Sequence, residues 1–278
     1  MRTNRRGVAL ILVLSLLVVL GAIAAEVGRT ARLEFGIVES VRSRTVARYA
    51  AESGIVAAVV RIDSLLRDAA TPHDRAAVFR DLDAQLASLT DVTLGDARFG
   101  VATTDLNARI DLNRSEPDIV RAFFGQFTHD QQAEIITTSL QARPLERIGE
   151  LAALPGVDDA LALAVMPYVT VWGDGLVNIN SAPEPVLAAS LGQDVARGIV
   201  GRRAAGEIFT ASAPEQTQSL QVTIAPAPPA ALVLTEPTRL LIIARGWRQG
   251  SPLTHEIQAV YAVTGGRLVL QVWQERDL

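Results

Sequence analysis

The hydrophobic pattern of the first part of the chain predicts one long helix that starts in a membrane. Residues 8–25 form a run without a charged side chain, which Glu26 ends. As a helix rising about 1.5 Å per residue, the run covers roughly 27 Å and matches the ~30 Å hydrocarbon core of a bilayer. Apolar residues then recur at steps of mostly three and four as far as Leu66, and the first proline is Pro72. We therefore expect a helix over residues 8–66 whose segment 8–25 is transmembrane.

The charges beside the apolar run predict its orientation. Arg2, Arg5 and Arg6 precede it, so the N-terminus is expected to stay cytoplasmic and the remaining chain to lie outside the membrane. The alternative is a cleavable secretory signal peptide, since residues 22–24 (Ala-Ile-Ala) have the small side chains that signal peptidase accepts. The run exceeds the ~7–15 apolar residues of a signal peptide and no helix breaker follows it. A retained anchor is therefore favoured.

Beyond the long helix, helical and extended patterns alternate. A helix is expected over residues 74–89. Within residues 99–112, two short alternating segments separated by residues 105–107 predict a hairpin that packs on the long helix. Further helices are expected over residues 130–140, 145–154, 158–166 and 193–203.

The C-terminal part predicts three antiparallel strands, over residues 239–247, 254–263 and 267–275, joined by short turns rich in glycine. Alternate side chains of these strands would pack on the second half of the long helix. The side chains expected there are Leu241, Ile243, Ile257, Ala259, Tyr261, Leu268, Leu270 and Val272.

Two segments of the middle region repeat the same sequence pattern. Residues 110–117 and 177–184 each end a strand near an asparagine and lead into a helix. Ser115 in the first, and Asn180 or Ser181 in the second, are expected to cap the helices. The repeat is interpreted as geometric rather than catalytic.

Composition and charge narrow the classes of function. With 278 residues, 49% of them hydrophobic and 20% charged, the chain is expected to fold around a core. Its 26 basic and 30 acidic residues give a net charge of −4, which does not favour a nucleic-acid partner. The absence of cysteine excludes disulfides, thiolate metal sites and cysteine nucleophiles.

A helix-hairpin-helix pattern in the middle region also argues against nucleic acid. Residues 148–157 resemble that element, in which a Pro-Gly turn exposes backbone amides that hold a phosphate in DNA-binding proteins. Asp158 and Asp159 place negative charge beside this turn. The basic cluster of Arg197, Arg202 and Arg203 is expected to be a solvated face.

Residues that could support catalysis or metal binding are scattered. His73, His129 and His255 have no partners at ligand spacing and are expected to be exposed or to cap helices. No Gly-x-Ser-x-Gly elbow or glycine-rich phosphate loop occurs. We expect no enzymatic activity, and acidic residues such as Asp158 and Asp174 are interpreted as surface carboxylates.

The start of the chain resembles a type IV prepilin signal, in Arg5-Arg6-Gly7 followed by the apolar residues 8–12. The resemblance implies that prepilin peptidase cuts between Gly7 and Val8 and methylates the new amine of Val8. Most pilins have glutamate at the fifth mature position, where this chain has Leu12. In that family the carboxylate neutralises the amino terminus of the neighbouring subunit, because a lone charge in a bilayer is costly. A subunit with no neighbour above it needs no such carboxylate; the alternative is that Leu12 is one more residue of an ordinary anchor.

Three further motifs, in order along the chain, are similar to those of the minor pseudopilin K family of type II secretion systems. They are Leu154–Val157 (Leu-Pro-Gly-Val), Pro167–Val171 (Pro-Tyr-Val-Thr-Val) and Val177–Ala182 with its Asn-x-Asn. The resemblance implies an α+β, type IV pilin-like fold with an antiparallel sheet and a large inserted α-helical domain. The implied division is a leader (1–7), the long helix (8–66), the first part of the body (67–113), the insert (114–209), a loop or linker (210–237) and the C-terminal sheet (238–278).

The same resemblance implies a role in protein secretion across the outer membrane. It places such a subunit at the tip of the pseudopilus, where it starts assembly, with its anchor in the inner membrane and its body in the periplasm. Implied partners are the minor pseudopilins H, I and J, the major pseudopilin G, prepilin peptidase and the inner-membrane secretion platform. Some members of the family bind calcium, but the sequence assigns no calcium site and no cofactor. The alternatives are a minor pilin of a type IV pilus and a secreted helix-hairpin-helix binding protein.

Overall fold

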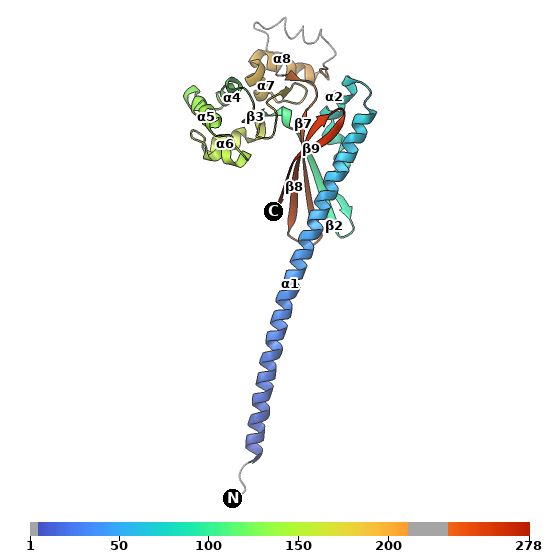
Figure 1. Ribbon diagram of the computed structural model, residues 1–278, viewed down its shortest axis with the longest axis vertical. Helices are drawn as coiled ribbons and strands as arrows, with labels where there is room; N and C mark the ends of the chain where they lie inside the picture. The colour runs from blue at the N-terminus through green and yellow to red at the C-terminus, as the bar shows by residue number, and fades with distance from the viewer. Residues whose placement is uncertain (1–4, 211–232) are drawn as a thin grey trace.

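The long helix dominates the architecture. The computed structural model describes residues 5–210 and 233–278. Helix α1 (Arg5–Asp68) is continuous over 64 residues. Its first half extends away from the rest of the molecule, and its second half lies along a sheet (Figure 1). The predicted long helix is confirmed.

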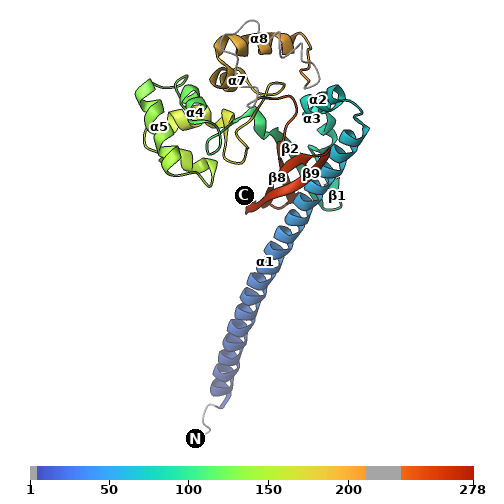
Figure 2. The same ribbon diagram turned by 45° about the horizontal axis from the view of Figure 1, so that its top comes forward.

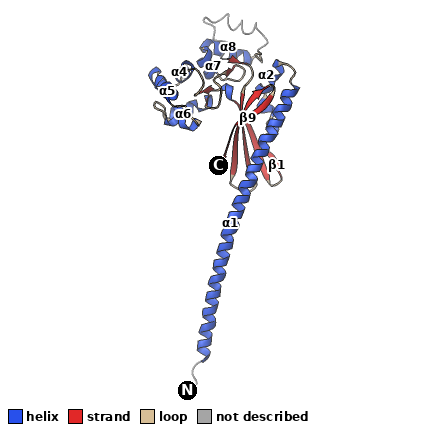
Figure 3. Ribbon diagram, in the orientation of Figure 1, coloured by secondary structure: helices blue, strands red, loops and turns tan. Residues whose placement is uncertain are grey.

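The body of the protein is a five-stranded antiparallel sheet in the order β1-β2-β7-β8-β9. Its strands are red in Figure 3. Its strands are β1 (Val92–Leu94), β2 (Ala97–Asp105), β7 (Arg239–Arg248), β8 (Thr254–Thr264) and β9 (Arg267–Asp277). The three predicted C-terminal strands are β7, β8 and β9. Strand β2 pairs along its whole length with β7, so the chain leaves the sheet after β2 and returns beside it.

Small residues allow α1 to lie close to the sheet. Its buried face contains Ala47, Ala50, Ala51, Ile55, Ala58, Ile62 and Leu66. The sheet meets this face with Leu240, Ile242 and Ala244 of β7 and with Ile257 and Ala259 of β8. The prediction for Leu241, Ile243 and Val272 is wrong, because these side chains lie in a separate cluster with Leu106 and Val260. Side chains alternate between the faces of a strand, so the expected register is off by one residue for Leu241 and Ile243 of β7. In β9, a register shift opposite Val260 and Tyr261 places Val272 on the other face, and Leu270 is 47% exposed instead of packing on the helix.

The segment between α1 and the sheet differs from the prediction of one helix over residues 74–89. It divides into α2 (Pro72–Arg80), α3 (Leu82–Gln85) and the 3₁₀ helix η1 (Ala87–Leu89). Thr71 and Asp74 form a reciprocal capping box at the start of α2. Asp81 and Leu86 leave helical geometry between the pieces, which turns the chain toward β1.

The predicted hairpin within residues 99–112 is also wrong. Strand β2 instead forms a hairpin with β1. The expected turn is the 3₁₀ helix η2 (Leu106–Ala108), and it leads to β3 (Ile110–Asp111), which pairs in parallel with β4 (Val169–Thr170). The strand pairing is therefore long-range, and local alternation did not reveal it.

The described residues between β3 and β7 (112–210 and 233–238) form a helical insert beside the top of the sheet (Figures 1 and 2). Its own core contains the fully buried Phe123, Phe124, Ile136, Leu187 and Ile199. The helical elements are α4 (Pro117–Phe124), α5 (Asp130–Ala142), η3 (Ile148–Ala153), α6 (Asp159–Val165), η4 (Met166–Tyr168), α7 (Glu184–Leu191) and α8 (Gln193–Ala204).

A second pair of short parallel strands lies in the insert. Strand β5 (Val177–Asn178) pairs with β6 (Val233–Leu234). The strand β6 falls within residues 210–237, which the sequence predicted as a loop or linker. Residues 211–232 of that segment lie outside the described residues.

Candidate functional site

The free half of α1 carries apolar side chains on all sides. Leu12 is 65% exposed, and the large apolar residues that follow it as far as Ile23 are each more than half exposed. Among the described residues, α1 is the one helix long and apolar enough to cross a membrane, with a mean hydropathy of 2.0 in its most apolar window. A helix that is hydrophobic all round needs lipid or protein around it. Gly7 and Val8 lie within the same helix.

Apolar exposure on α1 continues beyond the predicted membrane segment. Phe35 is 72% exposed and Val38 is 65% exposed. Where the sheet covers one side of the helix, Tyr49, Val56 and Val60 remain more than half exposed on another. We call these five residues the free face of α1. Exposed apolar surface of this extent is typical of an interaction site.

Two glycines set how closely α1 approaches the sheet. A Cβ placed on Gly246 of β7 would lie 2.2 Å from the carbonyl oxygen of Ala47 and 2.4 Å from the amide nitrogen of Ala51. On the helix, a Cβ on Gly54 would lie 3.0 Å from the ring of Phe99. The backbones of helix and strand therefore meet directly, which holds the free face in a fixed orientation relative to the sheet.

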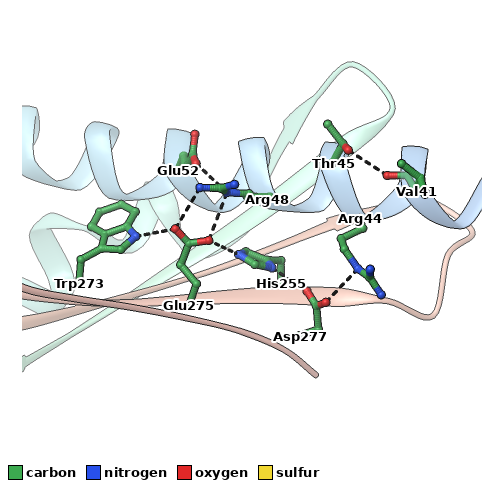
Figure 4. Close-up of polar contacts among 9 residues, drawn as sticks. All are labelled: Val41, Arg44, Thr45, Arg48, Glu52, His255, Trp273, Glu275 and Asp277. Carbon is green, nitrogen blue, oxygen red and sulfur yellow. Dashed lines mark hydrogen bonds and ion pairs between the residues drawn. The ribbon is translucent and has the colours of Figure 1, made fainter.

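A polar cluster joins α1 to the ends of β8 and β9 (Figure 4). The His255 ring lies between two carboxylates, with Nδ1 2.7 Å from Asp277 and Nε2 3.3 Å from Glu275. Arg44 of α1 lies 3.0 Å from Asp277, and Arg48 lies 3.2 Å from Glu275. A hydrogen bond from Trp273, together with Arg48 and His255, lowers the pKa of Glu275.

The position of His255 corrects a prediction. Its side chain is 8% exposed, whereas the sequence interpretation placed it at the surface or at a helix cap. The other two histidines, His73 and His129, are exposed. The alternation of β8 contains the missed signal, since His255 shares a face with the buried Ile257 and Ala259.

A second polar cluster fixes the insert to the body. Asn107 of η2 donates from Nδ2 to Asp174 at 2.7 Å, and its Oδ1 accepts hydrogen bonds from the backbone amides of Thr238 and Arg239. Asp174 also accepts a hydrogen bond from the Thr238 hydroxyl. Asp174 is therefore not a free surface carboxylate. The cluster joins the end of β2, the loop before β5 and the start of β7.

Asp105 extends this cluster into the insert. Its carboxylate accepts hydrogen bonds from Asn178 Nδ2 at 2.8 Å, from the Ser181 hydroxyl and from the Asn107 amide at 2.8 Å. Burial raises the pKa of Asp105, although these hydrogen bonds oppose the rise. The body and the insert thus share one network of buried polar groups.

The repeated sequence pattern corresponds to a repeated structural role. Asn113 exchanges two hydrogen bonds of 2.9 Å with the backbone of Leu145, just after α5. Asn180 does the same with Phe209, after α8, at 2.8 and 2.9 Å. In both halves an asparagine that follows a short strand holds the chain that leaves the second helix. The interpretation of the repeat as geometric fits these contacts.

The predicted helix caps in the repeat are wrong. The N-cap residues are Glu116 for α4 and Pro183 for α7, and neither makes a side-chain cap. The Ser115 hydroxyl is buried without a hydrogen-bond partner among the described residues. The prolines in the first turns satisfy part of the capping requirement, because they have no amide proton there.

The helix-hairpin-helix turn lies between η3 and α6. Gly156 adopts φ 84°, a conformation that favours glycine, and its carbonyl accepts a hydrogen bond of 2.6 Å from Gln132. Asp158 caps α6 by accepting from the Leu161 amide at 2.7 Å. The turn is thus occupied by internal hydrogen bonds and a carboxylate, a poor arrangement for binding phosphate.

The basic cluster on α8 is structural rather than solvated. Arg203 donates to the carbonyl oxygen of Ala182 at 2.8 Å. Arg202 pairs with Glu207 at 2.6 Å and stacks over the ring of Phe209. Only Arg197 has the expected exposed position, where it pairs with the neighbouring Asp194.

No group of three or more histidine or acidic side chains able to hold a metal ion occurs in the part of the chain that the structure describes. His255 contacts two carboxylates, those of Glu275 and Asp277. Arginines from α1 form ion pairs with both of these acids. Two features extend over the described part of the molecule. One is the free apolar half of α1, and the other is the insert, which hydrogen bonds join to the body at the opposite end.

Comparisons with known proteins identify the fold. No protein-family model and no curated protein matches the sequence. A chain in the crystal structure of the GspK-GspI-GspJ complex from the enterotoxigenic Escherichia coli type 2 secretion system is similar in structure, with a TM-score of 0.60 and 14% identity. The alignment covers 86% of this chain and 99% of that one. The fold is therefore that of a GspK-like pseudopilin, which confirms the predicted fold class.

Proposed function

We propose that this chain is a minor pseudopilin of a type II secretion system. The single observation that supports this most strongly is the free half of α1, which is too apolar to stand in water and is attached to a pilin-like sheet and a GspK-like insert. An assembly subunit needs such a helix in two environments: in the bilayer before assembly and among other helices afterwards. The role is structural, and no catalytic residues are assigned.

The proposal includes processing as a prepilin. Prepilin peptidase cuts between Gly7 and Val8, and the amine of Val8 is methylated. The anchor then spans the inner membrane once, with the leader in the cytoplasm and the body in the periplasm. Arg2, Arg5 and Arg6 support this orientation, because basic residues stay on the cytoplasmic side.

Two features support a place at the tip of the pseudopilus and a role in starting its assembly. Leu12 occupies the position where most pilins carry the glutamate that neutralises a neighbouring amino terminus. The insert lies beside the end of the body opposite the N-terminus (Figure 1), where it would obstruct a copy stacked above. Partners of the I and J type are proposed because the similar structure is a complex with GspI and GspJ. Pseudopilins H and G and the inner-membrane platform complete the proposed set.

A minor pilin of a type IV pilus is the alternative within the same fold. A secreted helix-hairpin-helix protein is a weaker alternative, since phosphate-binding geometry is absent at the described turn and the free face of α1 would remain in water.

Site-specific photocrosslinking in secreting cells tests the proposal. A crosslinking residue at Val56, which is 61% exposed on the free face, should give peptidase-dependent adducts with other pseudopilins. The matched control is Asp118 on α4, whose side chain is 88% exposed on the insert and which should not crosslink to them. Adducts with type IV pilins would support the alternative. An absence of pilin-like adducts from Val56 would refute the proposal.

A further inference from the structure

A cleft of about 320 Å³ lies where the body meets the insert. Phe79 and Asp83 from α2 and α3 line one side, and Tyr168 and Pro183 from the insert line another. Arg109, just after η2, and Leu240 of β7 also line the cleft. The volume is in the range of small-ligand sites. The lining mixes apolar side chains with charged and hydroxyl groups, Arg80 and Thr104 among them.

Arg109 is the unusual group in this cleft. Its side chain is partly buried, and burial lowers the pKa of its guanidinium. Among the described residues its guanidinium forms neither a hydrogen bond nor an ion pair, whereas its backbone amide donates to the carbonyl oxygen of Leu106 at 3.3 Å. Comparable partly buried arginines are paired, such as Arg75 with Glu236 at 3.1 Å and Arg202 with Glu207. A partly desolvated cation without a counter-ion is costly, and an anion in the cleft would offset that cost.

The carboxylates on the walls are already engaged. Asp83 accepts a hydrogen bond of 3.2 Å from the Thr103 hydroxyl, and Asp105 accepts from Asn178 and Ser181. Neither lies within ion-pair distance of Arg109. Their charge disfavours an anion with two or more charges, such as a phosphate. The planar fork of one arginine suits a single carboxylate with bidentate hydrogen bonds.

We propose that the cleft binds a carboxylate carried by an apolar group, with the carboxylate held by Arg109 and the apolar part packed against Phe79, Tyr168 and Pro183. The carboxylate belongs either to a small free acid or to the end of a peptide chain. This proposal does not rest on the proposed secretion role, because its premises are the cleft and the unpaired guanidinium of Arg109. Binding can also be measured on the isolated protein.

The test uses the full chain in lipid nanodiscs and titration calorimetry, with empty nanodiscs as the blank. Benzoate is the probe, and benzamide is its neutral control of nearly the same shape. We expect saturable binding of benzoate and binding of benzamide that is weaker by about tenfold or more, since a hydrogen-bonded charge is lost. Equal binding of the two, or no benzoate binding, would overturn the proposal. This contrast needs no variant.

Variants then assign the site. Arg109→Gln should weaken benzoate binding by about tenfold or more, and Arg109→Lys should weaken it less, because it keeps the charge but loses the fork. Arg147→Gln, an exposed arginine on the insert, is the matched control and should have no effect. Unchanged binding in a folded Arg109→Gln protein would refute the assignment.

A peptide arm separates the two sources. The peptide acetyl-Ala-Leu-Phe with a free carboxyl end is compared with its C-terminal amide. Tighter binding of the free acid than of benzoate supports a chain end as the ligand, whereas binding of benzoate alone supports a small acid. Equal binding of the acid and amide peptides, together with equal binding of benzoate and benzamide, would contradict any carboxylate site.

Discussion

Replacing Gly246 by alanine should strongly destabilise the packing between α1 and the sheet. The new Cβ would lie 2.2 Å from the Ala47 carbonyl oxygen and 2.4 Å from the Ala51 amide nitrogen. Both are backbone atoms of α1, so no side-chain rotation relieves the contact. The helix must retreat until the distance of 2.2 Å becomes at least 3.0 Å, below which real Cβ atoms are essentially never found.

The magnitude follows from that displacement. Overpacking of a filled core costs about 1–3 kcal/mol, and a radial gap of about 0.5–1 Å loses a quarter to a half of the dispersion energy across an interface. Because the contacts at Ala50 and Ala51 would open together, we expect the upper end, about 3 kcal/mol. At about 2–4 °C per kcal/mol for a domain of this size, the melting temperature should fall by roughly 6–12 °C.

The assay is thermal unfolding of the full chain in detergent micelles, followed by circular dichroism. Gly201→Ala is the matched control, since a Cβ there meets nothing within 4 Å on helix α8. This control should stabilise by about 0.5–1 kcal/mol, because alanine is the better helix former. If Gly246→Ala melts within 1 °C of the parent protein, the close helix–sheet contact described above is incorrect.

Three further predictions concern buried polar groups. Burial opposes ionisation of Glu256, but hydrogen bonds from Arg245, Gln258 and Arg276 hold its pKa below the ordinary value. Glu256→Gln should therefore lower the free energy of unfolding by about 1–2 kcal/mol at pH 7. The value is kept small because both arginines are more than half exposed to solvent. That cost should disappear as the pH falls through the lowered pKa, and a loss independent of pH would contradict it. Burial raises the pKa of Asp105. Its contribution to stability is therefore full below the ordinary value of 3.8 and declines as the pH rises through the raised value. In denaturant titrations, the stability of the parent relative to Asp105→Asn should fall as the pH is raised above 3.8, and a difference that does not change with pH would refute this. Asn180→Ala should cost about 2–3 kcal/mol in the same titrations, because it leaves a buried backbone amide unpaired, and a loss below 0.5 kcal/mol would show that the clamp is dispensable.

The elements that could be predicted from the sequence are those with a strong local signal. The long helix follows from uninterrupted apolar periodicity, and β7, β8 and β9 follow from alternation between glycine-rich turns. The predicted prepilin processing at Gly7 and Val8 rests on a short motif and remains a prediction. The prediction of a pseudopilin fold rested on three motifs that occur in order along the chain, and the structural comparison confirms that fold.

Other features depend on long-range contacts that local patterns do not contain. Strand β2 pairs with β7 across the whole insert, so the hairpin expected within residues 99–112 did not form. The sequence predicts Arg203 as a surface charge, yet it donates to the carbonyl oxygens of Ile179 and Ala182, which follow β5. His255 lies between carboxylates of β9 that are distant in sequence. In each case, the partner that decides the position of the residue comes from another part of the chain.

The mature N-terminus gives the most direct test of the central claim. The chain is purified from membranes of cells with and without prepilin peptidase, and its N-terminal peptide is identified by mass spectrometry. The account predicts a start at Val8 with a methylated amine, and only in cells that contain the peptidase. A start at Ala25, independent of that enzyme, would identify an ordinary exported protein and contradict the assignment as a pseudopilin.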